Sequence, residues 1–276
     1  MKIQYFGTAA AEGWPAVFCG CEACRRARSL GGHNIRTRAQ AMINDELLVD
    51  LPPDTYYHAL KYGVDLSAVE TLLITHSHQD HFYPFELFLR GFPYAHEPAA
   101  PVLTVYGNKK VRELYMENLK LCDSPNIEEH LRFCDAVPFE TFDTAEGYQV
   151  TPLLASHAKN EECLIYLIEK DGKRIFYAND SGFYPPETWQ FLAGKHLDLV
   201  SFDCTNVCTP DGKYHMGLPD NIEAKEHLIE LGCADENTQF VVTHFSHNGK
   251  LTHDEIVSEA QKNSFIAAYD GIIIEL

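Results

Sequence analysis

This sequence of 276 residues has no long apolar run, few basic residues and no recognisable export signal. It contains no stretch of 18 apolar residues, and its first residues do not combine basic charge with an apolar segment. We therefore expect a cytoplasmic protein that does not enter a membrane. Lys and Arg number 22 against 40 Asp and Glu, giving a formal net charge of −18. Since binding to nucleic-acid phosphates requires a basic patch, this charge argues against a nucleic-acid partner and favours a small-molecule substrate.

Apolar residues are plentiful, at 45% with 12% aromatics, which suffices for a large core. Predicted strands and helices alternate without a repeat or linker, so we expect one domain over residues 1–276. The clearest signals are a hairpin around Asp171-Gly172 and helices over 109–119 and 219–231. Residues 2–6 alternate like an edge strand, and Asp54 is placed to cap a helix. Two β-rich halves with interspersed helices predict an α/β fold with two packed sheets and helices outside.

A histidine-rich segment follows the apolar run 71–74 and reads Thr-His-Ser-His-Gln-Asp-His-Phe over residues 75–82. A strand sends alternate side chains to the same side, so His76 and His78 can hold one ion together. Asp80 and His81 lie past the strand end, where a loop can direct them at a second ion about 3.5–4 Å away. A single histidine at a strand end is usually an ordinary polar residue, but this crowding would be costly without coordination or hydrogen bonds.

Three further predicted strands end in residues that suit the same site. His157, Asp180 and His244 each follow an apolar, strand-like run. A carboxylate between two cations reduces their repulsion and leaves room for a bridging hydroxide as nucleophile, because a metal can lower the pKa of bound water to about 7. The expected set is His76, His78 and His157 for one ion, Asp80, His81 and His244 for the other, and Asp180 between them.

Cysteine forms one tight cluster. The sequence has nine cysteines, an odd number without an export signal, so a disulfide framework is not expected. Cys19, Cys21 and Cys24 form a C-x-C-x-x-C knuckle in which Gly20 permits a tight turn. Three converging thiolates predict a zinc site that needs a fourth ligand from elsewhere in the chain.

The histidine-rich motif, the later histidine, the bridging aspartate and the final histidine together resemble the metallo-β-lactamase superfamily, over nearly the whole chain. The resemblance implies an αββα sandwich of two mixed sheets, with a dinuclear metal site at the edge between them. A fold of this kind supports many reactions, so the superfamily alone does not define the substrate.

The segment from Gly7 to Ala11, the cysteine knuckle, Arg25 and Arg28 resemble the PhnP-type cyclic ribose phosphodiesterases of the carbon-phosphorus lyase pathway. They are less similar to PqqB, an accessory protein of pyrroloquinoline quinone synthesis. The phosphodiesterase resemblance implies that His247, in Thr-His-Phe-Ser-His at 243–247, completes a structural zinc site with the three cysteines. It also implies that His215 contacts the phosphate and protonates the leaving oxygen. Asp80 and His215 are therefore the expected catalytic residues.

These features predict a dinuclear metallohydrolase that cleaves a small phosphodiester, including cyclic ribose or nucleotide-like ones. The alternatives are a carboxylic ester, lactone or thioester hydrolase, and a PqqB-like protein that binds a cofactor precursor without catalysis. Zinc, manganese and iron all suit the histidine and carboxylate ligands, and zinc suits the knuckle. A dimer is the expected oligomer. The aromatic segment 82–101 either stacks a base or sugar or belongs to the core.

Overall fold

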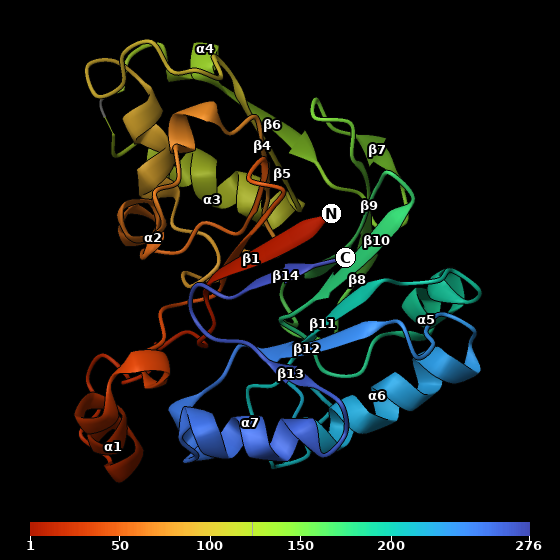
Figure 1. The fold of residues 1–276 in the computed structure, drawn as a ribbon. Coiled ribbons are helices and arrows are strands. Elements are labelled where there is room, and N and C mark those ends of the chain that lie inside the picture. The colour runs from red at the N-terminus through yellow and green to blue at the C-terminus, as the bar shows by residue number, and fades with distance from the viewer. Residues whose placement is uncertain (123) are drawn as a thin grey trace.

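Two seven-stranded sheets pack against each other in the computed structural model, which describes residues 1–122 and 124–276 (Figure 1). The first sheet has the order β14 (Ile273–Glu275), β1 (Lys2–Gly7), β2 (Gln40–Ile43), β3 (Leu47–Val49), β4 (Thr71–Leu73), β5 (Leu103–Gly107) and β6 (Leu131–Asp135). The second has the order β13 (Ile266–Ala267), β12 (Gln239–Thr243), β11 (Leu199–Asp203), β10 (Lys173–Ala178), β9 (Leu164–Lys170), β8 (Gln149–Leu154) and β7 (Phe142–Asp143).

Both sheets are mixed, and their parallel strands bring several chain segments to one edge. In the first sheet β3, β4, β5 and β6 are parallel neighbours. In the second sheet β10, β11, β12 and β13 are parallel neighbours, and β8 runs in the same direction because β9 is antiparallel to both β8 and β10. The carboxyl ends of parallel strands meet at one edge of a sheet, which is where ligands commonly bind.

Helices cover the outer faces of both sheets (Figure 1). The first sheet is covered by α2 (Thr55–Tyr62), α3 (Lys109–Leu119), α4 (Ile127–His130) and the 3₁₀ turns η2 (Leu66–Ala68) and η3 (Pro84–Arg90). The second is covered by α5 (Pro186–Leu192), α6 (Leu218–Glu230) and α7 (His253–Gln261). The remaining elements, α1 (Glu22–Leu30), η1 (Gly32–Asn34) and η4 (His247–Gly249), belong to the N-terminal loop region and the segment after β12.

Three apolar clusters form the layers of the molecule. One lies between the sheets and contains Tyr5 and Ile43 from the first sheet and Tyr166 and Leu199 from the second. The others join the first sheet to α3 and η3, and the second sheet to α5, α6 and α7. The predicted αββα sandwich is thereby confirmed.

Local expectations differ from the structure at two points. The strand predicted at residues 2–6 forms as β1 but is not an edge strand, because β14 and β2 flank it on either side. Asp54 stands at the start of α2 but does not cap it, because its carboxylate accepts hydrogen bonds from the backbone and guanidinium of Arg38. Within the described residues, no helix is long and apolar enough to span a bilayer.

Candidate metal centres

The histidine-rich segment leaves the sandwich directly after β4. His76 and His81 are buried, whereas His78 is more accessible. His76 Nε2 lies 2.9 Å from His78 Nδ1, so the two rings meet as predicted, although β4 ends at Leu73 and both residues lie beyond the strand. His157 enters from the loop after β8 in the other sheet, and its Nε2 lies 3.1 Å from His78 Nδ1. These three rings form the first group of candidate metal ligands.

A second group forms beside the first from Asp80, His81 and His244. The Nε2 atoms of His81 and His244 lie 3.2 Å apart, and Asp80 Oδ2 lies 3.2 Å from His81 Nε2. His244 follows β12 with a backbone φ of 62°, in the left-handed region. Such conformations in non-glycine residues cost about 1–3 kcal/mol and occur preferentially at functional sites.

Asp180, after β10, lies between the two groups. Its Oδ2 is 4.0 Å from the Nε2 of His76 and 3.3 Å from that of His157 in the first group. It is 3.7 Å from the Nε2 of His81 and 3.6 Å from that of His244 in the second. This is the position predicted for a bridging carboxylate. The structure thus brings together all seven residues predicted for the dinuclear site: His76, His78, Asp80, His81, His157, Asp180 and His244.

The outward-facing ring nitrogens show that the set suits cations. His157 Nδ1 donates to the carbonyl oxygen of Tyr214 over 3.1 Å, and His244 Nδ1 donates to Thr205 Oγ1 over 2.8 Å. A neutral imidazole that donates from Nδ1 presents a lone pair at Nε2. The lone pairs of several rings therefore converge around a carboxylate, which is favourable when a cation lies between them. We infer that these residues fit divalent metal ions.

Asp50 belongs to the site, although no sequence motif singles it out. It is fully buried after β3 and accepts hydrogen bonds from Thr75 N, Thr75 Oγ1 and His81 Nδ1, the last over 2.7 Å. Burial disfavours a charged His81, but Asp80 and Asp50 outweigh it and raise the pKa of His81 well above its usual value. Asp50 therefore fixes the orientation of His81.

His215 lies against the same centre, next to a second carboxylate that sequence reasoning missed. Its Nδ1 is 2.7 Å from Asp180 Oδ1 and 3.0 Å from Oδ2 of Asp203, which ends β11. Burial opposes the imidazolium form, but Asp180 and Asp203 outweigh it and raise the pKa of His215 to about 11. The side chain is 27% exposed. His215 can therefore hold a proton at neutral pH beside the predicted metal ligands.

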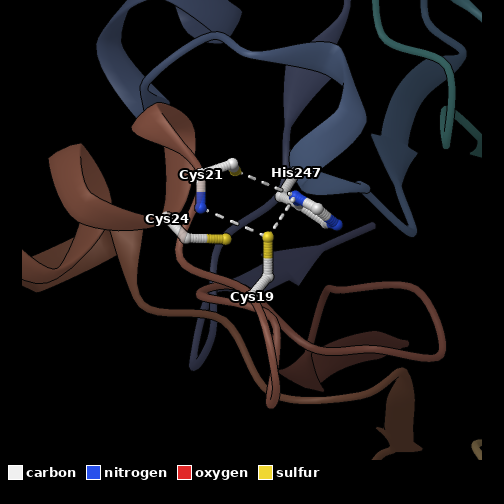
Figure 2. A group of neighbouring side chains, drawn as sticks. All are labelled: Cys19, Cys21, Cys24 and His247. Atoms are coloured by element: carbon white, nitrogen blue, oxygen red, sulfur yellow. Dashed lines mark hydrogen bonds between the residues drawn. The ribbon is translucent and has the colours of Figure 1, made fainter.

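Figure 2 shows the cysteine knuckle, in which Cys19, Cys21 and Cys24 face His247 from the opposite segment. The candidate ligand atoms all lie within 4.8 Å of one another. His247 Nδ1 is 3.4 Å from Cys21 Sγ and 3.9 Å from Cys19 Sγ. Hydrogen bonding from the backbone of Cys24, then from His247 and Cys19, lowers the pKa of Cys21 to about 6. Three sulfurs and one imidazole are a common tetrahedral zinc set, so this group fits zinc.

Surrounding contacts hold the knuckle against β12. His247 Nε2 lies 3.6 Å from Glu12 Oε1, so the ring presents Nδ1 to the sulfurs. The N-terminal loop also pairs with the residue after His244, because Phe245 N donates to the carbonyl oxygen of Thr8 and Ala10 N donates to that of Phe245. The knuckle and the histidine centre are therefore connected through the segment 244–247.

The aromatic segment 82–101 divides between core and surface. Phe82 and Phe88 are buried in the cluster between the first sheet and its helices. Phe92 and Tyr94 are 56% and 59% exposed. Part of the segment is thus core, and the exposed part is free to contact other molecules.

With the fold and site defined, comparison with known families identifies the class. Residues 47–245 match the family described as the beta-lactamase superfamily domain. The chain belongs to this superfamily and is a hydrolase with the metallo-β-lactamase fold. A ribonuclease Z from Leuconostoc mesenteroides is 23% identical over 300 residues, covering 98% of this chain and 86% of that protein.

Solved structures agree on the fold. A diphosphatase from the PhnP family superposes with a TM-score of 0.74 at 20% identity, covering 100% of this chain and 97% of the other. Zinc-bound PqqB from Methylobacterium extorquens superposes with a TM-score of 0.77 at 17% identity and covers all of both chains. The human short-form tRNase Z gives 0.67 at 17% identity, covering 100% of this chain and 99% of that one. The expected resemblance to the PhnP family is confirmed at the level of the fold.

Proposed function

We propose that this protein is a metal-dependent phosphodiesterase acting on a small diester. The observation that carries the proposal is the convergence of two candidate ligand groups, a carboxylate between them and His215 beside them. Relatives named ribonuclease Z and diphosphatase support a phosphate-containing substrate. We also propose that the first group and Asp180 hold one ion, that the second group and Asp180 hold the other, and that the knuckle holds a structural zinc.

The charge of residues near the centre favours an anionic substrate over a neutral ester. Lys159 and Lys213 are exposed and lie two residues from His157 and His215. Their ammonium groups are 5.8 and 5.1 Å from the ring centre of Tyr214, and together they lower the pKa of its hydroxyl. Within the described residues, neither lysine forms an ion pair with a carboxylate. The carbonyl oxygen of Tyr214 contacts His157, so both lysines lie near the centre. In a chain of net charge −18, two such cations without a carboxylate partner would attract a phosphate.

Two divalent cations in the histidine centre would supply Lewis-acid stabilisation of a phosphate and lower the pKa of water at neutral pH. Asp50 and Thr205 hold the rings of His81 and His244 in place, which keeps their Nε2 atoms directed inward. His215 holds a proton between the site and solvent. Proton donation to the leaving oxygen contributes roughly 10²–10⁴-fold to such reactions, and His215 is placed for that role.

Two other functions fit the fold. A carboxylic ester, lactone or thioester hydrolase could use the same ligands, and a PqqB-like protein could bind a cofactor precursor without catalysis. The lysine pair disfavours a neutral ester. The seven converging candidate ligands, with His215 beside them, favour catalysis over simple binding.

The test is hydrolysis of bis(4-nitrophenyl) phosphate by protein stripped of its histidine-centre ions and reloaded with manganese or zinc. We expect turnover only after reloading, with 4-nitrophenyl acetate cleaved much more slowly. The Asp80→Ala variant, prepared identically, controls for contaminating phosphodiesterases. Cleavage of the acetate alone would indicate an ester hydrolase. Absence of turnover with both ions bound would indicate the binding protein.

A further inference from the structure

Glu161 joins two loops that carry candidate metal ligands. It lies in the loop between β8 and β9, shortly after His157, and its side chain reaches Ser77 between His76 and His78. Ser77 N donates to Glu161 Oε2 over 3.0 Å, and Ser77 Oγ donates to Oε1 over 2.8 Å. The Glu161 carboxylate thus holds the loop after β4 through both the backbone and the side chain of Ser77.

A helix end holds the carboxylate in turn. Asn108 Nδ2 donates to Glu161 Oε2 over 3.0 Å and to the carbonyl oxygen of Glu162 over 2.8 Å. Asn108 is also the N-cap of α3, because its Oδ1 accepts from Val111 N over 2.9 Å. Glu161 therefore connects a loop of the second sheet to both a ligand loop and a helix of the first sheet.

We propose that Glu161 is a positioning residue that sets the metal affinity of the first ligand group by holding the His157 loop against the His76–His78 turn. The inference rests on the ligand set in the proposed function. His76 and His78 come from one sheet and His157 from the other, so their convergence depends on the contact between the two loops. The second group has supports of its own, because Asp50 holds His81 and Thr205 holds His244. We therefore expect its affinity to persist without Glu161, although Asp80 and His81 lie on the same loop as Ser77.

The expected effect is therefore selective. Loss of a residue that orients metal ligands typically lowers metal affinity 10–100-fold. In the Glu161→Ala variant we expect a loss of about this size for one of the two ions in the histidine centre, with the other ion bound as in the wild type. Glu162→Ala is the matched control, since Glu162 is the adjacent exposed glutamate and contributes its backbone carbonyl to the junction. It should leave both affinities unchanged.

The measurement is a Co²⁺ titration of metal-free full-length protein, followed by visible absorption, in which thiolate-to-cobalt bands separate the knuckle from the histidine centre. Glu161→Gln keeps one acceptor oxygen for Ser77 and should recover part of the lost affinity. Ser77→Ala should lower the metal affinity of the first group less in the Glu161→Ala background than in the wild type. The reason is that the two side chains act through one contact, which Glu161→Ala has already removed.

Three results would overturn the inference. Unchanged metal affinities in Glu161→Ala would by themselves exclude the positioning role, without affecting the proposed function. An equal loss for both ions, accompanied by a lower melting temperature, would make Glu161 a structural residue. If the wild-type histidine centre bound no ions, the ligand set of the proposed function would fail together with this inference. Because the readout is metal binding, failure of phosphodiester hydrolysis would not by itself affect it.

Discussion

The histidine centre and the cysteine knuckle are assembled in opposite ways. Three of the four knuckle residues fall between Cys19 and Cys24 on one loop, and only His247 comes from elsewhere. The histidine centre collects residues that follow β4, β8, β10 and β12, so it exists only when both sheets are packed. A local cluster can help to fold the chain, whereas a centre built from distant strand ends is a product of the finished fold.

The two regions also differ in the type of metal ligand that they offer. Three sulfurs and one imidazole complete a tetrahedral zinc shell and leave no position for a substrate. The histidine centre has imidazole and carboxylate donors, a central Asp180 and His215 nearby. We therefore assign stability to the knuckle and reactivity to the histidine centre, and the predictions below test that division.

The largest effect is expected for Asp80→Ala. Removing this carboxylate from the second ligand group should lower phosphodiesterase kcat/KM by at least about 10²–10³-fold, as loss of one preorganised electrostatic partner does. The melting temperature should stay close to that of the wild type, because Asp80 is not part of the apolar core. Steady-state kinetics and thermal unfolding of the same sample measure both. A variant that unfolds would show that Asp80 is needed for the stability of the fold rather than for catalysis.

His215→Ala tests whether His215 donates a proton. For a diester with an alkyl leaving group, kcat should fall about 10²–10⁴-fold, whereas an activated 4-nitrophenyl leaving group needs little protonation and should be nearly unaffected. Parallel assays of the two substrates give the comparison. An equal loss on both would mean that His215 acts by binding the phosphate. A loss on the aryl substrate alone would contradict the proposal.

Cys21→Ser should act on stability first. We expect loss of one zinc and a decrease of several kcal/mol in the free energy of unfolding. This is less than the roughly 10–16 kcal/mol of zinc-binding free energy in zinc-finger peptides, because the sandwich persists without the zinc. Metal analysis and denaturant unfolding measure these. Cys208→Ser, at an exposed cysteine outside the knuckle, is the control. Full zinc content and full stability in Cys21→Ser would refute the structural-zinc assignment.

His58 gives a smaller effect that belongs to neither centre. Burial lowers its pKa to about 4, and its ring contacts Thr37 Oγ1 and Gln40 Oε1. The unfolded chain therefore binds a proton near pH 6.5 that the folded chain excludes until about pH 4. The contribution of neutral His58 to the free energy of unfolding is fully present above pH 6.5 and is lost as the pH falls to 4. It amounts to at most about 3 kcal/mol.

The His58→Gln variant should flatten that part of the pH dependence, with His227→Gln, at an exposed histidine, as the control. The difference between variant and wild type isolates His58 from acid release of metal, which affects both proteins equally. Denaturant unfolding between pH 4 and 7 is the measurement. Parallel curves for His58→Gln and wild type would refute the assignment.

The sequence predicted most of what depends on residue order. His76 and His78 were correctly predicted to lie together, although the reason given was wrong, because both lie beyond the end of β4 rather than on an alternating strand. Polar residues at strand ends indicated His157, Asp180 and His244. Asp50 and Asp203 also end strands, but the sequence does not show which side chains they contact. Their roles depend on contacts between strands that the order of residues does not specify.

Other features required the three-dimensional packing. Glu161 contacts Ser77 across 84 positions of the sequence, and no spacing rule relates the two. The left-handed backbones of Asp50 and His244 are also invisible in the sequence, since neither is a glycine or part of a turn motif. The predicted edge strand at residues 2–6 was wrong because β14, the last strand of the chain, pairs with it.

We expect one chain to hold two kinds of metal environment, a structural one at the knuckle and a reactive one at the histidine centre. The most direct measurement is metal content combined with X-ray absorption of zinc-reconstituted protein, in the wild type and in Cys21→Ser. We predict three zinc ions per chain, with sulfur ligands on one of them, and loss of only the sulfur-bound ion in the variant. A single zinc, or loss of all three ions together in Cys21→Ser, would contradict the division of the molecule into a structural and a reactive centre.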